Sequence, residues 1–139
     1  LFNLYKFRTM RKLTPNIATH LLENPDKHIL NSGKILRLYS LDELPNLFNI
    51  ILGHMTFIGP RPALYNQKDL IDLRINSGVD VLMPGITGWA QVNGRDDISN
   101  NDKVNLDKEY LNKKSFFFDI KILFRTIYYA FFKKTGVKH

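Results

Sequence analysis

SFFFDIKILFRTIYYAFFKK, which spans residues 115–134, is the segment that most constrains the architecture of this chain. Nine of the 17 aromatic residues lie within residues 110–132. Apolar side chains recur here with the period of an α-helix, at Phe116, Ile120, Leu123, Phe124, Ile127 and Phe131. Asp119, Thr126 and Lys133 fall on the opposite face of such a helix. The spacing therefore predicts an amphipathic helix that is too aromatic for an ordinary surface helix.

Two interpretations of this helix stay open. Asp119, Lys121 and Arg125 interrupt the apolar run, which therefore falls short of the about 20 apolar residues of a membrane-spanning helix. A helix of this kind suits a membrane interface, where each basic residue adds on the order of 1 kcal/mol of attraction to an anionic surface. The alternative is a core helix with a cationic end.

Length and composition indicate an ordinary globular protein. The chain has 139 residues, of which 44% are hydrophobic and 24% charged, and we expect one domain over residues 1–139. It has no cysteine, which excludes disulfides, cysteine-based zinc sites and thiol nucleophiles and fits a reducing compartment. Because the first residue is Leu1 and no signal peptide is visible, the chain can be part of a longer protein.

The net charge of +7 is unevenly distributed. Residues 1–12 carry a net charge of +4, residues 13–112 carry −3, and residues 113–139 carry +6. Basic ends of this kind are typical of proteins that meet nucleic acid, an anionic membrane surface or a phosphorylated ligand. The aromatic helix near the C-terminus favours the membrane surface.

Hydrophobic spacing, proline and glycine predict short elements along the rest of the chain. In the first half we expect a strand over 4–10, a helix from Thr14-Pro15 to just before Asn24-Pro25, a loop over 24–34, a helix over 44–52 that ends at Gly53, and a strand over 55–58. In the second half we expect a rigid turn over 59–62, a helix over 63–76, a strand over 86–92, a turn at Asn93-Gly94, and a helix capped by Asn101 or Asp102 that ends near Lys113. The expected fold class is α+β: a compact, helix-rich domain with a small β-sheet and amphipathic helices at a membrane interface.

Asp42 and Glu43 open the helix expected over 44–52. The amides and the macrodipole at a helix start favour negative charge, so at least one of these carboxylates is expected to stay ionised. Ser40 and Glu43 match a capping box, but with Ser40 as the cap Pro45 would lie one turn inside the helix. We therefore place Asp42 at the cap. In the simplest interpretation Asp42 is only an N-cap and Glu43 only a first-turn acid.

Arg61 lies between Pro60 and Pro62. A following proline favours extended geometry, so the backbone at Arg61 is expected to be stiff. A guanidinium held in a fixed place suits a phosphate group, because its planar fork donates two hydrogen bonds. The alternative is a turn whose arginine is merely solvated.

Glycines cluster in two short motifs, Gly85–Gly88 and Asn93–Arg95. Glycine lets a backbone approach a ligand closely, and exposed amides bind a phosphate or a uracil edge, so a nucleotide contact is one interpretation. The alternative is a hairpin with tight turns. Acids in the same region offer oxygen ligands for Mg²⁺ or serve only as helix caps, namely Asp96, Asp97, Asp102 and Asp107. The four histidines are scattered and match no metal or triad motif.

Taken in order, these motifs resemble the bacterial sugar transferase family, the monotopic phosphoglycosyl transferases. The resemblance rests on KFRTM at 6–10, SLDELP at 40–45, IGPRP at 58–62, PGITG at 84–88, AQVNGR at 90–95, Leu106-Asp107 and DIKIL at 119–123. The match covers nearly the whole chain, and the small enzymes of protein-glycosylation and capsule pathways look most similar. The family's N-terminal re-entrant membrane helix is absent from this sequence, and Met83 stands where the family usually has Arg.

The resemblance implies a reaction at the cytoplasmic face of the bacterial inner membrane. A sugar 1-phosphate would pass from a UDP-sugar to a polyprenyl phosphate, usually undecaprenyl phosphate, with release of UMP and a requirement for Mg²⁺. By resemblance Asp42 attacks the sugar-bearing phosphorus and forms an aspartyl phosphosugar intermediate. Glu43 would assist with the metal or with proton transfer. This transfer would be the first membrane step of glycan assembly.

The resemblance also implies which residues meet the ligands. Substrate contacts are expected at Lys6, Arg8, Arg61, Thr87, Gln91, Asn93 and Arg95. Metal ligands are expected at Asp42, Glu43 and Asp107. The expected partners are the UDP-sugar, the polyprenyl phosphate and an anionic membrane surface.

Two other functions compete with this one. A nucleic-acid-binding module would fit the sequence pI of about 9.7 but would not explain the acidic middle of the chain or Asp42-Glu43, so no nucleic acid is expected. A non-catalytic membrane-surface module derived from such a transferase would share the aromatic helix but would need neither Asp42 nor Arg61.

Overall fold

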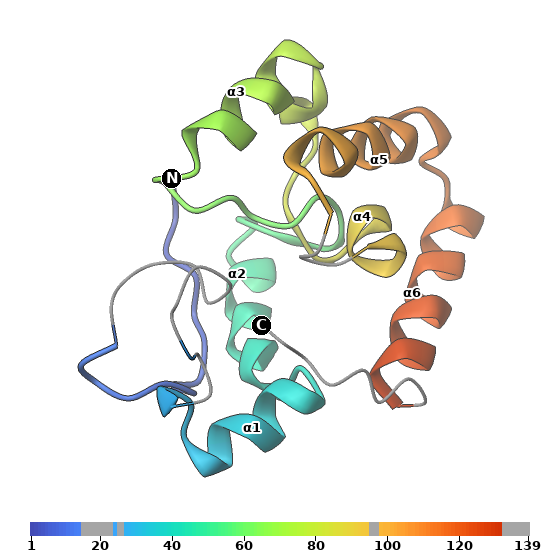
Figure 1. The fold of residues 1–139 in the computed structure, drawn as a ribbon. Coiled ribbons are helices and arrows are strands. Elements are labelled where there is room, and N and C mark those ends of the chain that lie inside the picture. Colours follow the sequence, from blue (N-terminus) through green and yellow to red (C-terminus); the bar gives the residue numbers. More distant parts are fainter. Residues whose placement is uncertain (15–23, 25–26, 95–97, 132–139) are drawn as a thin grey trace.

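The computed structural model describes residues 1–14, 24, 27–94 and 98–131. Helices dominate this part of the chain (Figure 1), as expected for a helix-rich α+β domain. In chain order the elements are α1 (Asn31–Leu38), the 3₁₀-helix η3 (Leu41–Asn46), α2 (Leu47–Ile51), β1 (Thr56–Ile58), α3 (Lys68–Asn76), the 3₁₀-helix η4 (Val79–Val81), β2 (Gly85–Thr87), α4 (Trp89–Asn93), α5 (Asn100–Lys113) and α6 (Phe116–Phe131). The helix expected to begin at Thr14-Pro15 lies outside the described residues.

The small sheet consists of two parallel strands. Thr56 pairs with Gly85, and Ile58 pairs with Thr87. Parallel strands need a crossover connection, and α3 lies within that connection. The hairpin interpretation of the glycine-rich region is therefore wrong, because the chain enters α4 directly after β2.

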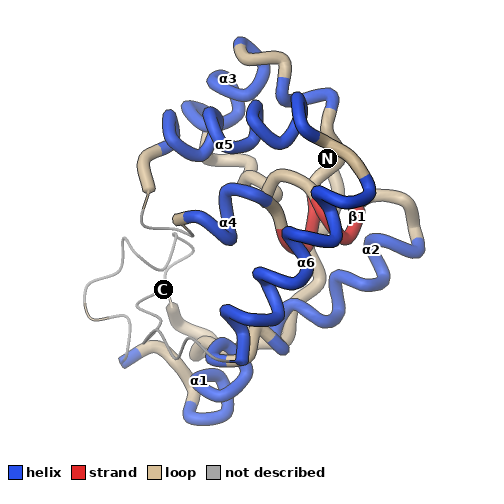
Figure 2. Tube along the Cα trace, turned by 90° about the vertical axis from the view of Figure 1, so that its right-hand side faces the viewer, coloured by secondary structure: helices blue, strands red, loops and turns tan. Residues whose placement is uncertain are grey.

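The core lies where α4, α5 and α6 meet. Its buried members are Trp89, Val92, Tyr110 and Ile122, with Phe118 packed against them. The Tyr110 hydroxyl donates a hydrogen bond of 2.8 Å to Asp119, which ties α5 to α6. Figure 2 shows α6 crossing in front of the sheet, and it contacts both strands.

Helix α6 turns its predicted apolar stripe outward. Phe116 is 73% exposed and Phe124 is 69% exposed, whereas Ile122 is fully buried. Asp119 and Thr126, on the face opposite the stripe, contact Tyr110 and Thr87. The core-helix interpretation is therefore wrong for this stripe, because the polar flank packs inward and the aromatic side chains face out. Among the described residues, no helix combines the length and apolar character needed to cross a membrane.

The N-terminal segment differs from the expected strand over 4–10. It forms no strand, and its ladder is limited to an isolated antiparallel bridge between Met10 and Ile29. The loop expected over 24–34 is wrong from Asn31 onward, where helix α1 begins. Gly33 allows close contact between α1 and the N-terminal segment, since a Cβ at this position would overlap the carbonyl oxygen of Thr9.

Other boundaries also move. Helix α3 begins at Lys68 rather than at 63, after a turn in which Gln67 accepts a hydrogen bond of 2.9 Å from the amide of Leu64. The strand expected over 86–92 is wrong beyond Thr87, where the chain becomes α4. Ser99 caps α5 instead of Asn101 or Asp102, because its hydroxyl accepts the amide of Asp102.

Candidate active site

The 3₁₀-helix η3 sets the backbone of Asp42 and Glu43. It begins at Leu41, after Ser40 in the left-handed region (φ 55°), so the expected N-cap at Asp42 is wrong. Pro45 has no N–H to donate within the helix. The carbonyl of Asp42 accepts the amide of Phe7 at 2.9 Å instead. The proline thus leaves an acceptor that fixes the N-terminal segment beside the two acids.

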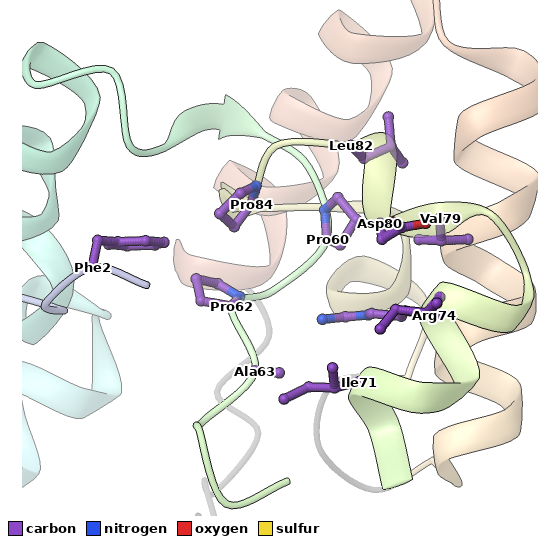
Figure 3. Close-up of a pocket in the computed structure, with 11 residues that line it drawn as sticks. Phe2, Pro60, Pro62, Ala63, Ile71, Arg74, Val79, Asp80, Leu82 and Pro84 are labelled. Carbon is purple, nitrogen blue, oxygen red and sulfur yellow. The ribbon is translucent and has the colours of Figure 1, made fainter. Parts of the chain in front are cut away.

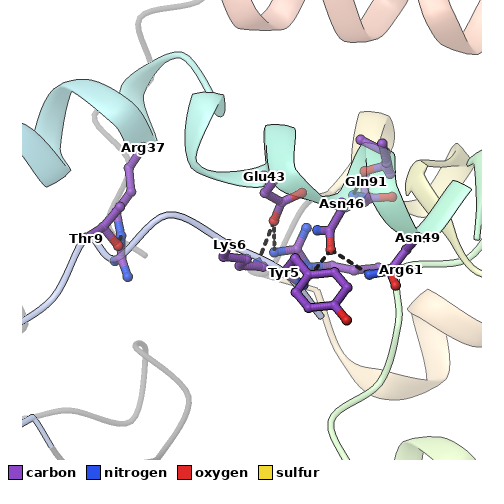
Figure 4. Close-up of polar contacts among 10 residues, drawn as sticks. Tyr5, Lys6, Thr9, Arg37, Glu43, Asn46, Asn49, Arg61 and Gln91 are labelled. Carbon is purple, nitrogen blue, oxygen red and sulfur yellow. Dashed lines mark hydrogen bonds and ion pairs between the residues drawn. The ribbon is translucent and has the colours of Figure 1, made fainter. Parts of the chain in front are cut away.

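Two buried asparagines extend this attachment. The Asn46 side-chain oxygen accepts the amide of Tyr5 at 3.1 Å. The Asn49 side-chain amide donates to the carbonyl of Asn3 at 2.9 Å and to Asn46 at 3.2 Å. The N-terminal segment is therefore hydrogen-bonded to η3 and α2 at Asn3, Tyr5 and Phe7. Lys6, which lies between Tyr5 and Phe7, projects toward Glu43 (Figure 4).

Glu43 forms ion pairs with two cations. Its Oε1 accepts hydrogen bonds from Lys6 Nζ at 2.7 Å and from Arg61 Nη2 at 3.0 Å. Burial raises the pKa of the Glu43 carboxyl, but the charges of Arg61 and Lys6 outweigh it, so the pKa lies below its usual value. Glu43 is therefore the carboxylate that stays ionised.

Asp42 behaves in the opposite way. Burial and the neighbouring charge of Glu43 raise its pKa, and Lys6 and Arg37 oppose this only in part. No side chain of the described residues donates a hydrogen bond to its carboxyl group. Environments that push two adjacent carboxyl pKa values apart are typical of catalytic pairs. Asp42 is thus the member of the pair that remains open to a ligand.

Arg37 is a site residue that the sequence interpretation passed over. Its Nε donates to Thr9 Oγ1 at 2.9 Å, while its buried Nη1 has no partner among the described residues. Its positive charge acts on Asp42. Arg37 precedes Asp42 by only five residues, but this spacing does not predict that the two are close in space. Their proximity depends on the left-handed backbone at Ser40, which the sequence does not reveal.

Asp107 occupies a different environment from the expected metal site. It is 1% exposed within α5, and its Oδ2 accepts Arg74 Nη2 at 2.8 Å and Arg74 Nε at 3.0 Å. Burial raises its pKa, and Arg74 opposes this. The structure thus commits this carboxylate to an ion pair, and the role of Asp107 as a metal ligand stays a prediction.

The donor set near Asp42 suits Mg²⁺ when phosphate is present. Among the residues that the structure describes, no three His, Cys, Asp or Glu side chains cluster as in a metal site built from protein ligands alone. Mg²⁺ in phosphate-handling enzymes commonly takes only one or two carboxylates and completes its coordination with water and substrate phosphates. Asp42 and Glu43 fit that requirement.

The other predicted contacts fall into two groups. Lys6 and Arg61 converge on Glu43, and Arg8 is exposed on the same N-terminal segment. Thr87, Gln91 and Asn93 lie on β2 and α4, where they bond to the Thr126 hydroxyl, the Ile86 carbonyl and the Trp89 carbonyl. Their substrate contacts stay predictions, and Arg95 lies outside the described residues.

A small cavity of about 190 Å³ borders the turn that carries Arg61. Figure 3 shows Pro60 and Pro62 on one wall, facing Ile71 and Arg74 of α3. Its walls are mostly apolar. The Pro60–Pro62 turn therefore has open space on one side and Glu43 on the other.

Comparison with known proteins identifies the family of this chain. The sequence model of the bacterial sugar transferase family matches residues 1–133, and the chain belongs to that family. It is 42% identical over 127 residues to the uncharacterized sugar transferase EpsL of Bacillus subtilis, covering 91% of this chain and 61% of EpsL. It is 36% identical to the UDP-glucose:undecaprenyl-phosphate glucose-1-phosphate transferase of Escherichia coli, covering 96% of this chain and 30% of that protein. It is 35% identical to the undecaprenyl-phosphate galactose phosphotransferase of Salmonella typhimurium, covering 91% of this chain and 29% of that protein.

Proposed function

We propose that this chain carries the catalytic site of a transferase that moves a sugar 1-phosphate from a UDP-sugar to polyprenyl phosphate and releases UMP. The observation that carries the proposal is the pair formed by Asp42 and Glu43. One carboxylate is pinned by Lys6 and Arg61, and the other is open to a ligand. Named relatives act on undecaprenyl phosphate with different hexoses, which supports the acceptor and leaves the sugar open.

In the first step Asp42 is the nucleophile. An oxygen of its carboxylate forms a bond to the sugar-bearing phosphorus, and the bond from that phosphorus to the UMP oxygen breaks. UMP leaves with that electron pair, and an aspartyl phosphosugar remains. A nucleophile of this kind splits one difficult transfer into two easier steps.

In the second step an oxygen of the polyprenyl phosphate attacks the same phosphorus, and the bond to Asp42 breaks. The carboxylate is thereby regenerated. Phosphoryl transfer depends mainly on positioning and on neutralising the charge of the phosphate oxygens. Arg61 and Lys6 are placed to provide part of that charge, while Glu43 holds both of them.

We infer a Mg²⁺ requirement from the same residues. Asp42 and Glu43 would hold the ion together with phosphate oxygens and water. When bound, it would neutralise charge on the diphosphate and its leaving group. The described residues contribute the remaining positive charge through Lys6, Arg37 and Arg61.

We also propose that the domain rests on the cytoplasmic face of the bacterial inner membrane. Helix α6 presents an exposed aromatic stripe, and α2 presents Phe48 and Ile51, which are 65% and 80% exposed. So many exposed apolar side chains indicate that this surface contacts a membrane or a partner. The basic ends of the sequence favour an anionic lipid surface.

The direct test measures UMP release from the full-length protein with Mg²⁺, a panel of UDP-sugars and undecaprenyl phosphate. Asp42→Asn is expected to lower kcat by roughly 10³-fold or more, because the amide is not a nucleophile toward phosphorus. The matched control is Asp72→Asn, an exposed acid of α3, which should retain full activity.

Unchanged UMP release by the Asp42→Asn variant would show that Asp42 is not the nucleophile. If the wild-type protein binds vesicles but shows neither UMP release nor metal-dependent UDP-sugar binding, the non-catalytic membrane-surface module replaces the transferase.

A further inference from the structure

We propose that Arg74 is a positioning residue that fixes the Arg61 turn against Glu43, and that Asp107 in turn orients Arg74. The catalytic consequence rests on the proposed transferase function. The geometric part of the proposal concerns only contacts within this chain.

One guanidinium makes contacts in two directions. Arg74 Nη1 donates to the backbone carbonyl of Arg61 at 2.8 Å. Its Nε and Nη2 donate to Asp107 Oδ2 at 3.0 and 2.8 Å. The side chains are 12% exposed for Arg74 and 2% for Asp107, so these bonds are shielded from water.

The turn that bears Arg61 needs support from outside. Pro60 and Pro62 have no N–H to donate, and residues 59–67 form no helix or strand in this fully described stretch. Two successive carbonyls of the turn are nevertheless held. Pro60 accepts the amide of Gly85 at 2.9 Å, and Arg61 accepts Arg74.

This support lies beside a cavity. Figure 3 shows Arg74 extending along the cavity between α3 and the proline turn. Apolar side chains of the turn and of α3 line this cavity from both sides. The hydrogen bond from Arg74 Nη1 to the Arg61 carbonyl joins α3 to the turn beside it.

A simple tie between helices would not need this arrangement. The Arg74–Asp107 pair alone could join α3 to α5, and a buried ion pair often adds little net stability compared with apolar side chains of similar size. The bond from Arg74 to the Arg61 carbonyl serves no purpose in such a tie. It holds the backbone from which the Arg61 side chain reaches Glu43, where Nη2 lies 3.0 Å from Oε1.

The first experiment separates positioning from stability. In Arg74→Met/Asp107→Leu, apolar side chains replace the ion pair, so we expect a thermal midpoint close to that of the wild-type protein. We expect kcat for UMP release to fall about 100-fold with little change in KM, because a displacement near 1 Å costs about that much. Wild-type kcat in this stable variant would overturn the proposal.

Arg74→Lys is the second variant, in case the double replacement fails to fold. Lysine keeps the charge next to Asp107 but lacks the fork that reaches both partners. We expect the same loss of kcat. Lys113→Met, which removes the exposed pair with Glu109 on α5, is the matched control and should retain wild-type activity.

A double-mutant cycle with Arg61→Ala tests whether Arg74 acts through Arg61. If it does, Arg74→Lys lowers kcat in the wild-type background but changes it less than about 2-fold in the Arg61→Ala background. Equal losses in both backgrounds would show that Arg74 acts by another route.

A last readout does not depend on activity. In ¹⁵N-arginine-labelled protein, the Nε–H signal of Arg61, assigned with Arg61→Lys, should move toward that of the exposed Arg8 when Arg74 is replaced by Lys. An unchanged Arg61 signal overturns the positioning role. If the wild-type protein releases no UMP but this signal moves, the transferase proposal fails while the positioning of Arg61 stands.

Discussion

Asp42 and Glu43 are neighbours in the chain, yet their carboxyl pKa values move in opposite directions. Glu43 faces Lys6 and Arg61, which favour its charged form. Asp42 is partly buried beside the Glu43 charge, which disfavours its own charged form. The difference comes from their partners, because Glu43 accepts hydrogen bonds from Lys6 and Arg61. In the proposed reaction, a cation bound beside Asp42 would favour its charged form.

The pair predicts opposite effects of neutralisation on stability. At pH 7, Glu43→Gln should lower the thermal midpoint, because the wild-type carboxylate stabilises the fold above its unfolded pKa near 4.5. That difference should disappear as pH falls through the lowered folded pKa. Asp42→Asn should raise the midpoint at pH 7, because a carboxyl with a raised folded pKa stabilises the fold only below that pKa.

Thermal unfolding of both variants between pH 3 and pH 8 checks these signs, with Asp72→Asn as the control that stays near wild type. The assignment of the two roles is wrong if Glu43→Gln stabilises the protein at neutral pH, or if Asp42→Asn destabilises it.

At the scale of elements, Gly33 decides how α1 meets the N-terminal segment. Glycine inside a helix normally costs about 1 kcal/mol relative to alanine, so Gly→Ala would ordinarily stabilise. Here the added Cβ would overlap the carbonyl of Thr9. Because that carbonyl also accepts the amide of Leu30 at 2.9 Å, the segment has little freedom to move away.

We therefore expect Gly33→Ala to destabilise the protein by about 1–3 kcal/mol, as overpacking does. Chemical denaturation measures this free energy of unfolding. Lys34→Ala, an exposed change in the same helix, should stay within about 0.5 kcal/mol of wild type. Stabilisation by Gly33→Ala would mean that α1 and the N-terminal segment are not packed as described.

The same elements show what the sequence could predict. Regular hydrophobic spacing predicted α6 and the region of α2, and a capping residue predicted the helix that is α5. It missed α1 and misassigned residues 4–10, since both depend on contacts between segments far apart in the sequence, such as Thr9 with Arg37 and Tyr5 with Asn46. Proline motifs located Arg61, but the half-buried Arg74 that donates to its carbonyl carries no local signal.

The site shows the same division. Asp42, Glu43 and Arg61 were found from motifs with a physical meaning. The asparagines Asn46 and Asn49, which fix the N-terminal segment, were not, because their contacts join η3 and α2 to residues 3–5. Sequence spacing thus indicated the chemistry, whereas the supporting contacts needed the fold.

At the scale of the whole molecule, the apolar surface of α6 is the feature that a water-soluble monomer would least favour. The helix buries Ile122, turns the half-buried Asp119 and Thr126 inward and exposes most of its aromatic side chains. Lys121 and Arg125 lie at the border of the stripe, over the ring of Trp89 at 5.4 and 5.2 Å. Cations that flank an aromatic stripe suit the boundary between lipid headgroups and acyl chains.

This arrangement predicts a change in vesicle binding without a change in fold. Phe117→Ser and Phe124→Ser should each weaken binding to vesicles that contain anionic lipid by roughly 10-fold or more, because a phenylalanine loses about 1.5–3 kcal/mol of apolar burial. Both residues are exposed, so thermal midpoints should be unchanged. Phe118→Ser, which removes a ring packed on Trp89 and Tyr110, should instead destabilise the fold.

Co-sedimentation with vesicles at two salt concentrations measures the binding, which should be weaker at high salt because salt screens the basic residues. Vesicle binding that survives both serine substitutions would place the lipid contact elsewhere on the molecule.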